Sequence, residues 1–546
     1  MKVSLRVSIE NIIKNKGENM YLSMDMGTSS TRLWLNDRSN IIAQSCESFG
    51  ASFKKMNGAE AFFERVNTLI DSVLSDASIQ RTDVECMIVS GMGGSEIGLC
   101  EIAHISLPVD LYKLADSVVR KDIPEISGID VLFVPGIKQT NGTGLCDIMR
   151  GEETELYGIL SDMSEAEDCT FVFPGTHNKI IRVNSDGRIE HFCTTMSGEM
   201  IDLLVRQSIL AGSVSHDFKA CAEYVLRGAL DANQNGIGYA AFHTRVMSKN
   251  GVDVDSLSSY IYGAVISQDI SVIGKIANGS KIYVGGRRGL RDIYSILLQN
   301  ENTVELEEKI ALGAVRRGLG EIYRIYSTKK KKAEIIKKLE REKLIAIIRD
   351  PDTDTLFKAV DALYEGGVRF LEVTFDRSGK TSSIETAKII SMLCEKYKGR
   401  MHIGAGTVTS IEQVELTAVA GGEYIISPNT DAKVIAHTRE IGLVAIPGAY
   451  TATEIAAAAE NGADFIKLFP ADDVSFKYVK AVKAPLSDIR LLAVGGVNAE
   501  NARSFIENGF CGVGVGSNLY DLKLVRDGRF AELTERARAY IDALKT

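Results

Sequence analysis

The stretch LVAIPGAYTATEIAAAAENGADFIKLFPA (443–471) decides the fold of the C-terminal half of the chain. It consists of a short apolar run, an amphipathic segment that ends at a glycine, and a second apolar run. Such alternation predicts two parallel strands joined by a helix. Outward from this stretch the unit occurs eight times, with the apolar runs LIAIIR (344–349), LEVTF (371–375), HIGAGTV (402–408), EYIISP (423–428), LVAIPGAY (443–450), FIKLFP (465–470), IRLLAVGG (489–496) and GVGVGS (512–517). Eight units predict a closed (β/α)8 barrel of the TIM type, and an open doubly wound sheet is the alternative.

The ends of these runs carry the candidates for chemistry, because a barrel of this type holds its active site at the C-terminal ends of its strands. Those positions are Arg349, Glu372, Thr407, Pro428, Lys467, Gly496 and Ser517. Lys467 is set in the apolar run FIKLFP, and burial there disfavours its charged form. A neutral lysine amine can attack a ketone to form a Schiff base. Glu372, in the equally apolar LEVTF, can move protons to and from such an intermediate.

Each of these interpretations has a plainer alternative. Lys467 and Glu372 can form a buried ion pair with no chemical role. The glycine-rich ends AVGG (493–496) and GVGVGS (512–517) expose N–H groups that suit a phosphate, but tight turns alone also explain them.

The C-terminal half resembles the 2-keto-3-deoxy-6-phosphogluconate and -galactonate aldolases over essentially its whole length. The motifs that carry the resemblance are LEVTF, GAGTV, ISPNTD, PGAYTATE, IKLFPA, VGGV and GVGS. The resemblance implies that Lys467 forms the Schiff base, that Glu372 is the acid/base, and that no metal or other cofactor is needed. It further implies a carboxylate site at Thr407, a keto-acid pocket lined by Pro428, and a phosphate site at Gly495, Gly496 and Ser517. Arg349 matches an arginine of the galactonate-type members, whereas Asp376 stands where gluconate-type members often have an arginine, with Arg377 one position later.

The N-terminal half begins with YLSMDMGTSSTRLWLND (21–37), which predicts a β-hairpin with Asp25, Gly27 and Thr28 at its tip. The N–H groups of this turn and the Thr28 hydroxyl suit a nucleotide phosphate, and Asp25 can lie beside its Mg²⁺. An ordinary turn is the alternative. A second hairpin, FVFPGTHNKIIRV (171–183), places Gly175, Thr176 and His177 at its tip, and KIYVGGRRGL (281–290) ends a strand at Gly285 and Gly286, which suits the adenosine side of ATP.

This half resembles the 2-dehydro-3-deoxygalactonokinase family from Met24 to about Ile325. The motifs are DMGTSSTRLW, GMGGSEIG, VPGIKQ, CDIMRGEETEL, PGTHNKIIRV, TMSGEM and VGGRRGL. The resemblance implies an actin–hexokinase fold of two lobes and phosphorylation of a keto-deoxy sugar acid by Mg-ATP. The candidates for the catalytic base are Asp25, Glu152, Glu153 and Glu199. His177 can contact substrate or cap its turn, and four cations can meet phosphate or carboxylate, namely Arg32, Lys179, Arg287 and Arg288.

The composition fits a globular enzyme of anionic small molecules. Apolar residues make up 45% and charged residues 25% of the chain, and the net charge of −9 speaks against nucleic-acid partners. No apolar run is long enough to span a membrane. The nine cysteines include no CxxC pair, which is typical of reduced thiols in the cytoplasm.

Four lysines (329–332) mark the change from one pattern to the other. We expect an N-terminal extension (1–19), with Met20 as the natural start, two kinase lobes (20–326), a joining helix (327–343) and an aldolase barrel (344–546). A homo-oligomer, a trimer through the barrels by resemblance, is expected.

The predicted function is bifunctional: phosphorylation of 2-dehydro-3-deoxy-D-galactonate at O6, then cleavage of the product to pyruvate and D-glyceraldehyde 3-phosphate. One alternative is the same chemistry on the gluconate epimer. The other is an active aldolase whose N-terminal half senses sugar acids without catalysis.

Overall fold

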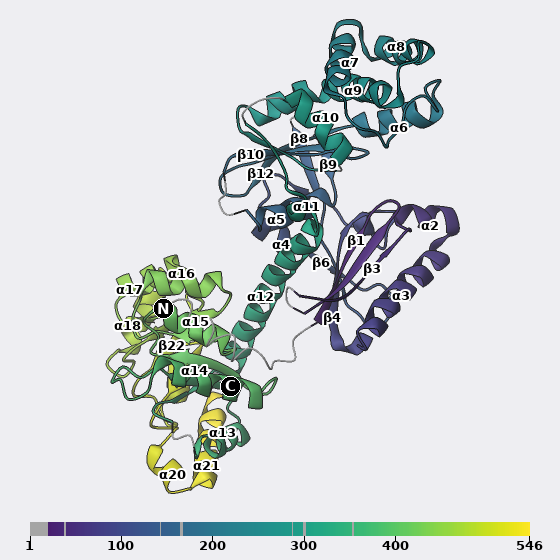
Figure 1. Cartoon of the computed structure of the whole chain (residues 1–546). Helices are drawn as coiled ribbons and strands as arrows, with labels where there is room; N and C mark the ends of the chain where they lie inside the picture. The colour runs from purple at the N-terminus through teal and green to yellow at the C-terminus, as the bar shows by residue number, and fades with distance from the viewer. Residues whose placement is uncertain are drawn as a thin grey trace. The chain divides into compact units, whose positions relative to one another are not determined.

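The computed structural model of the chain describes residues 20–37, 40–141, 144–163, 167–286, 288–298, 302–351 and 354–545 (Figure 1). The chain divides into two compact units between Tyr326 and Ser327, here called the N-terminal unit and the C-terminal unit. The expected extension over residues 1–19 lies outside the described residues. Among the helices that the structure describes, none combines the length and the apolar character that crossing a membrane requires.

The first sheet of the N-terminal unit has the strand order β3-β2-β1-β4-β7-β6. Strands β1 to β3 form an antiparallel meander, and β4 and β7 run parallel to β1. Helix α3 packs its apolar face, with Phe62, Val66 and Ile70 fully buried, into the core of this sheet. The elements are β1 (Met20–Met26), β2 (Thr31–Asp37), β3 (Asn40–Glu47), α2 (Ala51–Asn57), α3 (Ala59–Asp76), β4 (Val84–Gly91), β6 (Val119–Lys121) and β7 (Val131–Phe133).

The second sheet repeats five strands of the first, because its order β12-β11-β10-β13-β14 has the same sequence of antiparallel and parallel pairings as β3-β2-β1-β4-β7. Two sheets of one topology are the mark of the actin–hexokinase fold, so the expected two-lobed architecture is confirmed. The elements are β10 (Cys169–Phe173), β11 (Asn178–Val183), β12 (Ile189–Thr195), α6 (Ser197–Gln207), α7 (Ala222–Asn235), α8 (Ile237–Lys249), α9 (Val254–Ala277), β13 (Lys281–Val284), α10 (Arg288–Leu298) and β14 (Thr303–Glu305).

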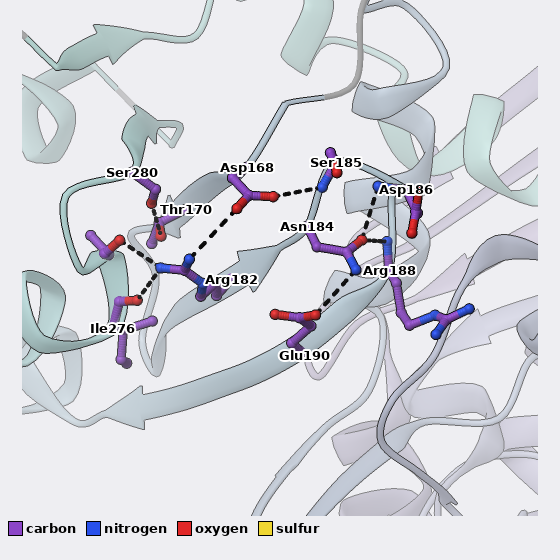
Figure 2. Close-up of polar contacts among 11 residues, drawn as sticks. Asp168, Thr170, Arg182, Asn184, Ser185, Asp186, Arg188, Glu190, Ile276 and Ser280 are labelled. Carbon is purple, nitrogen blue, oxygen red and sulfur yellow. Dashed lines mark hydrogen bonds and ion pairs between the residues drawn. The ribbon is translucent and has the colours of Figure 1, made fainter.

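A side chain of the second sheet fixes the longest helix beside it. Figure 2 shows Arg182 of β11 reaching the end of α9, where its guanidinium donates to the carbonyl oxygens of Ile276 (3.1 Å) and Ala277 (2.6 Å). These carbonyls have no partner within the helix, and a cation also suits the negative end of the helix dipole. Arg182 therefore anchors α9 to the sheet.

Two helices cross each other between the two sheets, and each has a glycine at the crossing point. Gly158 of α5 (Glu152–Leu160) and Gly318 of α12 (Ala314–Glu342) lie where a Cβ atom would come within 2 Å of the other helix's main chain. Glycine at both positions therefore lets the two helices touch. A three-stranded sheet, order β5-β8-β9, lies beside them. The remaining elements here are β5 (Ile105–Ser106), α4 (Leu111–Asp116), β8 (Ile137–Asn141), β9 (Gly144–Met149) and α11 (Glu308–Ala311).

The C-terminal unit is a closed parallel barrel in the described residues, as the eight runs predict. Its sheet runs β19-β18-β17-β16-β15-β23-β22-β21-β20. β19 and β20 are two parts of the fifth run, interrupted at Pro447, which has no N–H for the sheet. β19 pairs with β18 and β20 with β21, so this run closes the ring and excludes the open sheet. The strands are β15 (Leu344–Ile348), β16 (Phe370–Thr374), β17 (His402–Gly406), β18 (Tyr424–Ile426), β19 (Val444–Ile446), β20 (Gly448–Ala449), β21 (Ile466–Leu468), β22 (Leu491–Val494) and β23 (Gly512–Val515).

Helices follow the strands and cover the outside of the barrel (Figure 1). The side chains between strands and helices form one continuous apolar core. The helices are α13 (Leu356–Glu365), α14 (Ser383–Lys396), α15 (Ile411–Val419), α16 (Ala432–Glu440), α17 (Ala452–Glu460), α18 (Phe476–Lys483), α19 (Ala502–Glu507), α20 (Leu522–Arg526) and α21 (Phe530–Leu544).

The second part of α12 closes the N-terminal end of the barrel. Ile335 and Leu339, one helical turn apart, pack with the interior side chains of the barrel strands. The lysine run adds ion pairs at the same end: Lys331 lies 3.0 Å from Glu423, and Lys332 lies 2.8 Å from Asp464. Residues 327–342 are thus helical and are part of the C-terminal unit.

Candidate active sites

Lys467 and Glu372 project into the barrel from strands on opposite sides of it, with Arg349 close enough to act on both. Burial raises the pKa of Glu372, which is 2% exposed, while Lys467 and Arg349 lower it. Burial also lowers the pKa of Lys467, against the influence of Glu372. Both side chains are therefore pushed towards their neutral forms. In the described residues they form no ion pair with each other; the Lys467 ammonium lies 5.0 Å from the centre of the Phe469 ring.

Glu372 occupies space that a neighbouring strand leaves free. A Cβ atom on Gly406 of β17 would lie 1.5 Å from Oε1 of Glu372. The next residue, Thr407, has φ 59°, a left-handed backbone that is strained for a branched side chain. Pro428 follows β18, and its carbonyl oxygen is packed against Gly448. The end of β17 and the residue after it, GAGT (404–407), thus lie next to the Glu372 carboxyl group inside the barrel.

The ends of β22 and β23 bring the predicted phosphate-binding residues to one edge of the barrel. Gly495 (φ 99°) and Gly496 (φ 67°) both have left-handed backbones, and a Cβ on Gly496 would meet the side chain of Asp472 at 2.3 Å. Ser517 is exposed. The turn is held by the Asn501 side chain, which donates to the Gly496 carbonyl at 3.0 Å.

In the N-terminal unit, Asp25 is the last residue but one of β1 and lies opposite Arg32 of β2. The Arg32 Nε donates to Asp25 at 3.0 Å, and a second guanidinium nitrogen bonds to the same oxygen. Burial raises the pKa of Asp25 in spite of Arg32. The Gly27 amide closes the turn onto the Ser30 carbonyl at 2.8 Å, which leaves Thr28 exposed.

The second hairpin turn rests on a buried polar network. Asn178 accepts from the Gly175 amide (2.9 Å) and donates to Asp269 (2.9 Å) and to the Tyr294 hydroxyl (2.7 Å). Ser197, the first residue of α6, also donates to Asp269, at 2.7 Å. This network ties the turn to three helices and leaves Thr176 and His177 exposed.

Two further contacts fix the surroundings of that turn. His177 Nε2 lies 2.8 Å from Glu199 of α6. Gly286 (φ 87°) comes so close to Pro174 that a Cβ there would lie 3.1 Å from it, which brings the VGG turn beside the PGTH turn. Gly285 is held to β10 through the Val172 carbonyl at 2.9 Å. Arg287 lies outside the described residues, as does the side chain of Arg288.

The first turn of α5 carries acids that face both hairpins. Lys179 and His177 of the second hairpin lower the pKa of Glu152 against burial. Asp25 and Arg32 of the first hairpin act on Glu155, whose pKa is raised to about 7 by burial first and then by Glu152 and Asp25.

Glu153 is turned inward and is fully buried. It accepts the Gly151 amide at 2.8 Å, and burial raises its pKa to about 7. The position of α5 is fixed through its next residue, because the Ser90 hydroxyl of β4 donates to Thr154 at 2.8 Å. The two hairpins therefore converge on α5.

Sequence reasoning missed some of these residues. Glu155 had a signal, since it lies three residues after Glu152 and so on the same face of a helix. Asp269 and Tyr294, which bond to Asn178, are more than 90 positions away from it in the sequence. The local sequence pattern around Asn178 therefore could not predict these contacts.

Comparison with known proteins agrees with this geometry. The model of the 2-keto-3-deoxy-galactonokinase family matches residues 25–322, and that of the KDPG and KHG aldolase family matches residues 335–536. The chain is 36% identical over 204 residues to the 2-dehydro-3-deoxy-6-phosphogalactonate aldolase of Escherichia coli (strain K12), covering 37% of this chain and 94% of that protein. It is 27% identical over 307 residues to a protein of Rhizobium meliloti (strain 1021) named probable 2-dehydro-3-deoxygalactonokinase DgoK1. This match covers 54% of this chain and 94% of that protein. A solved structure titled native KDPGal is 36% identical over 37% of this chain and 93% of that one, with a TM-score of 0.33.

The chain therefore belongs to the 2-keto-3-deoxy-galactonokinase family through its N-terminal unit and to the KDPG and KHG aldolase family through its C-terminal unit, and it is a sugar-acid kinase fused to an aldolase.

Proposed function

We propose that the two units catalyse consecutive steps: ATP-dependent phosphorylation of 2-dehydro-3-deoxy-D-galactonate at O6, and retro-aldol cleavage of the resulting 6-phosphate. The observation that carries the second step is the Lys467–Glu372 pair inside the barrel, where burial favours a neutral amine beside a carboxyl group. The first step is supported by the kinase family, which implies the use of ATP. A kinase that makes a 6-phosphate supplies what the fused aldolase cleaves.

In the cleavage step the neutral Lys467 amine attacks the C2 ketone of the 6-phosphate. The neutral Glu372 carboxyl donates a proton to the carbinolamine hydroxyl, which leaves as water, and Glu372 becomes a carboxylate. The resulting iminium ion then accepts the electrons of the C3–C4 bond. Glu372 takes the proton of the C4 hydroxyl as that bond breaks and glyceraldehyde 3-phosphate leaves. The enamine is protonated at C3, and water hydrolyses the imine to release pyruvate and the free amine.

The other barrel residues bind the substrate in this proposal. Arg349 and Thr407 hold the carboxylate, and Pro428 lines the keto-acid pocket. The turn after β22 and the end of β23 bind the 6-phosphate through the main-chain N–H groups of Gly495 and Gly496 and the hydroxyl of Ser517. This barrel chemistry requires no metal, because the iminium ion serves as the electron sink.

In the kinase unit the two hairpin turns bind the ATP phosphates. Gly27 and Thr28 form one turn, Gly175 and Thr176 the other, and Gly285 and Gly286 lie on the adenosine side. Glu152 and His177 face the sugar acid, and the buried Glu153 supports them from behind by holding the Gly151 amide. The convergence of both hairpins on α5 supports the phosphate and sugar-acid assignments, and the contact of Gly286 with Pro174 supports an adenosine site beside the second hairpin.

Mg²⁺ fits the acids near the first hairpin. Asp25, proposed as its ligand, lies beside Glu155, and repulsion between such buried acids is relieved by a cation. In the described residues no three acidic, histidine or cysteine side chains form a complete metal site. Mg²⁺ commonly binds one or two carboxylates together with substrate phosphates and water, and it would neutralise phosphate charge when bound.

We also propose the assembly and the boundaries. The lobes extend over 20–326, the joining helix over 327–343 and the barrel over 344–546, preceded by an extension over 1–19. A homotrimer through the barrels is proposed from the resemblance to this aldolase family. The nine cysteines, all thiols in the described part of the chain, support a cytoplasmic location.

Two experiments test the proposal. Borohydride reduction in the presence of pyruvate should fix the ligand on Lys467, and labelling of another lysine would defeat the mechanism. Asp25→Asn should abolish ADP formation and leave cleavage of the 6-phosphate intact.

The alternatives have their own readouts. Faster turnover of the phosphorylated gluconate epimer would replace the galactonate assignment. Failure to form ADP with any keto-deoxy sugar acid would favour an N-terminal unit that only senses such acids.

A further inference from the structure

Three residues form a row across the inside of the barrel. Glu372 of β16 is the register partner of Gly404 in β17. The pairing of Ala405 with Ile425 places Gly404 beside Tyr424 in β18. Glu372 and Tyr424 are therefore two strands apart at one level, with only a hydrogen atom of glycine between them.

Both ends of this row carry a buried polar group that has room for one more hydrogen bond. Glu372 is 2% exposed and Tyr424 is 0% exposed. In the described part of the chain, Oε2 of Glu372 has no hydrogen-bond partner. The Tyr424 hydroxyl oxygen faces the main-chain N–H of Leu371, and its own proton has no acceptor. Buried polar atoms in native proteins are nearly always paired, with protein or with an ordered water molecule. A carboxyl oxygen without a donor and a hydroxyl proton without an acceptor, both in one row, therefore point to a shared partner.

The Tyr424 ring reaches across β17 towards β16. A Cβ atom on Gly404 would lie 2.3 Å from two atoms of that ring, so the ring lies directly over this glycine. Burial raises the pKa of Tyr424 well above its usual range and Glu372 raises it further, while the main-chain N–H of Leu371 acts in the opposite direction. The hydroxyl is therefore at β16, next to the residue that precedes Glu372.

We propose that Tyr424 is a positioning residue of the aldolase, whose hydroxyl donates a hydrogen bond through one buried water molecule to Oε2 of Glu372. The water donates to the carboxylate and accepts from the tyrosine. This chain of two hydrogen bonds therefore favours the ionised form of Glu372. This inference rests on the acid/base role proposed above for Glu372.

Other charged groups also act on this pair. Lys467 and Arg349 face Glu372 from β21 and from the end of β15, and both favour the carboxylate. Glu423 and Cys394 act on Tyr424 from the other side and oppose ionisation of the phenol. Tyr424 therefore remains a donor across the working pH range, and its contribution can be removed without changing any charge.

The test is Tyr424→Phe, which deletes one oxygen and keeps the ring over Gly404. If the hydroxyl stabilises the carboxylate, its loss raises the pKa of Glu372. The acid limb of the kcat profile for cleavage should then move to higher pH by about one unit. Incorporation of 3-fluorotyrosine at position 424, a stronger donor of the same shape, should move the limb to lower pH.

Matched variants separate this role from packing. Tyr397→Phe removes another buried hydroxyl, which bonds to Asp361 at 2.6 Å and to the Phe357 carbonyl at 3.2 Å, both on α13. It should lower thermal stability without moving the profile. A Tyr424→Phe enzyme whose profile superimposes on that of the parent would overturn the inference. Glu372→Gln tests the underlying function separately, since retention of cleavage in that variant would refute the role of Glu372 itself.

Discussion

Gly406→Ala should disable the aldolase through a single methyl group. The added Cβ would lie 1.5 Å from Oε1 and 2.3 Å from Cδ of Glu372, whereas uncompressed carbon contacts lie at about 3.5 Å or more. The carboxyl group must then retreat by about 2 Å. A misplacement of about 1 Å can cost roughly a hundredfold in rate, so we expect kcat for cleavage to fall by a factor of about 100 or more.

The assay is release of pyruvate from the 6-phosphate, coupled to lactate dehydrogenase, with ADP formation from the unphosphorylated acid measured separately. ADP formation should stay at the parental rate. Ala405→Gly is the matched control: it changes one methyl group on the same strand but on the face that packs against the helices, and should cost stability only. A folded Gly406→Ala enzyme that cleaves within threefold of the parent would refute the reasoning, because Glu372 would then not need its present position.

Three further perturbations have defined outcomes. Borohydride trapping of pyruvate should increase with pH with a midpoint below 10.5, since burial lowers the pKa of Lys467. Glu372→Gln should lower that midpoint further, because Glu372 raises the pKa of Lys467. An unchanged midpoint in the variant would contradict the electrostatic interaction between the two side chains. Glu155 has a pKa of about 7 against an ordinary 4.5, so the folded unit keeps a proton that the unfolded chain loses, and stability falls as pH rises across that window. Glu155→Gln should flatten this decline in the thermal midpoint of the N-terminal unit. Asp269→Ala should lower the free energy of unfolding of that unit in urea by about 3 kcal/mol, because Asn178, Tyr294 and Ser197 lose a buried partner. Asp255 is exposed on the same helix, and Asp255→Ala should lower this free energy by less than about 1 kcal/mol.

The barrel could be predicted from the sequence because its strands are buried on both faces. Such strands appear as continuous apolar runs, and the eight runs correspond to the strands of the ring. Lys467 and Glu372 stood out for the same reason, since a charge in such a run is costly. The two hairpins were visible through glycine and threonine between alternating apolar residues.

The supports of both sites could not be predicted in this way. Gly406 is read locally as a turn glycine, and only the fold shows that the Glu372 carboxyl group occupies the space beside it. Asn178 looks like an ordinary turn residue until β11, α9 and α10 bring Asp269 and Tyr294 to it. These contacts depend on how strands and helices pack together in the folded protein. The periodicity of apolar residues within a single segment does not predict that packing.

The position of α12 in the chain sets the order in which the protein can assemble. Leu339 leaves the ribosome after the whole N-terminal unit and 176 residues before Val515, the last residue of the last barrel strand. At about 5–20 residues per second, Ile335 and Leu339 wait on the order of 10–35 s for the ring that buries them. Throughout that interval the lysines at 329–332 flank the waiting apolar pair on the same helix, and charges placed so are the kind of neighbour that keeps a nascent segment from associating with other chains.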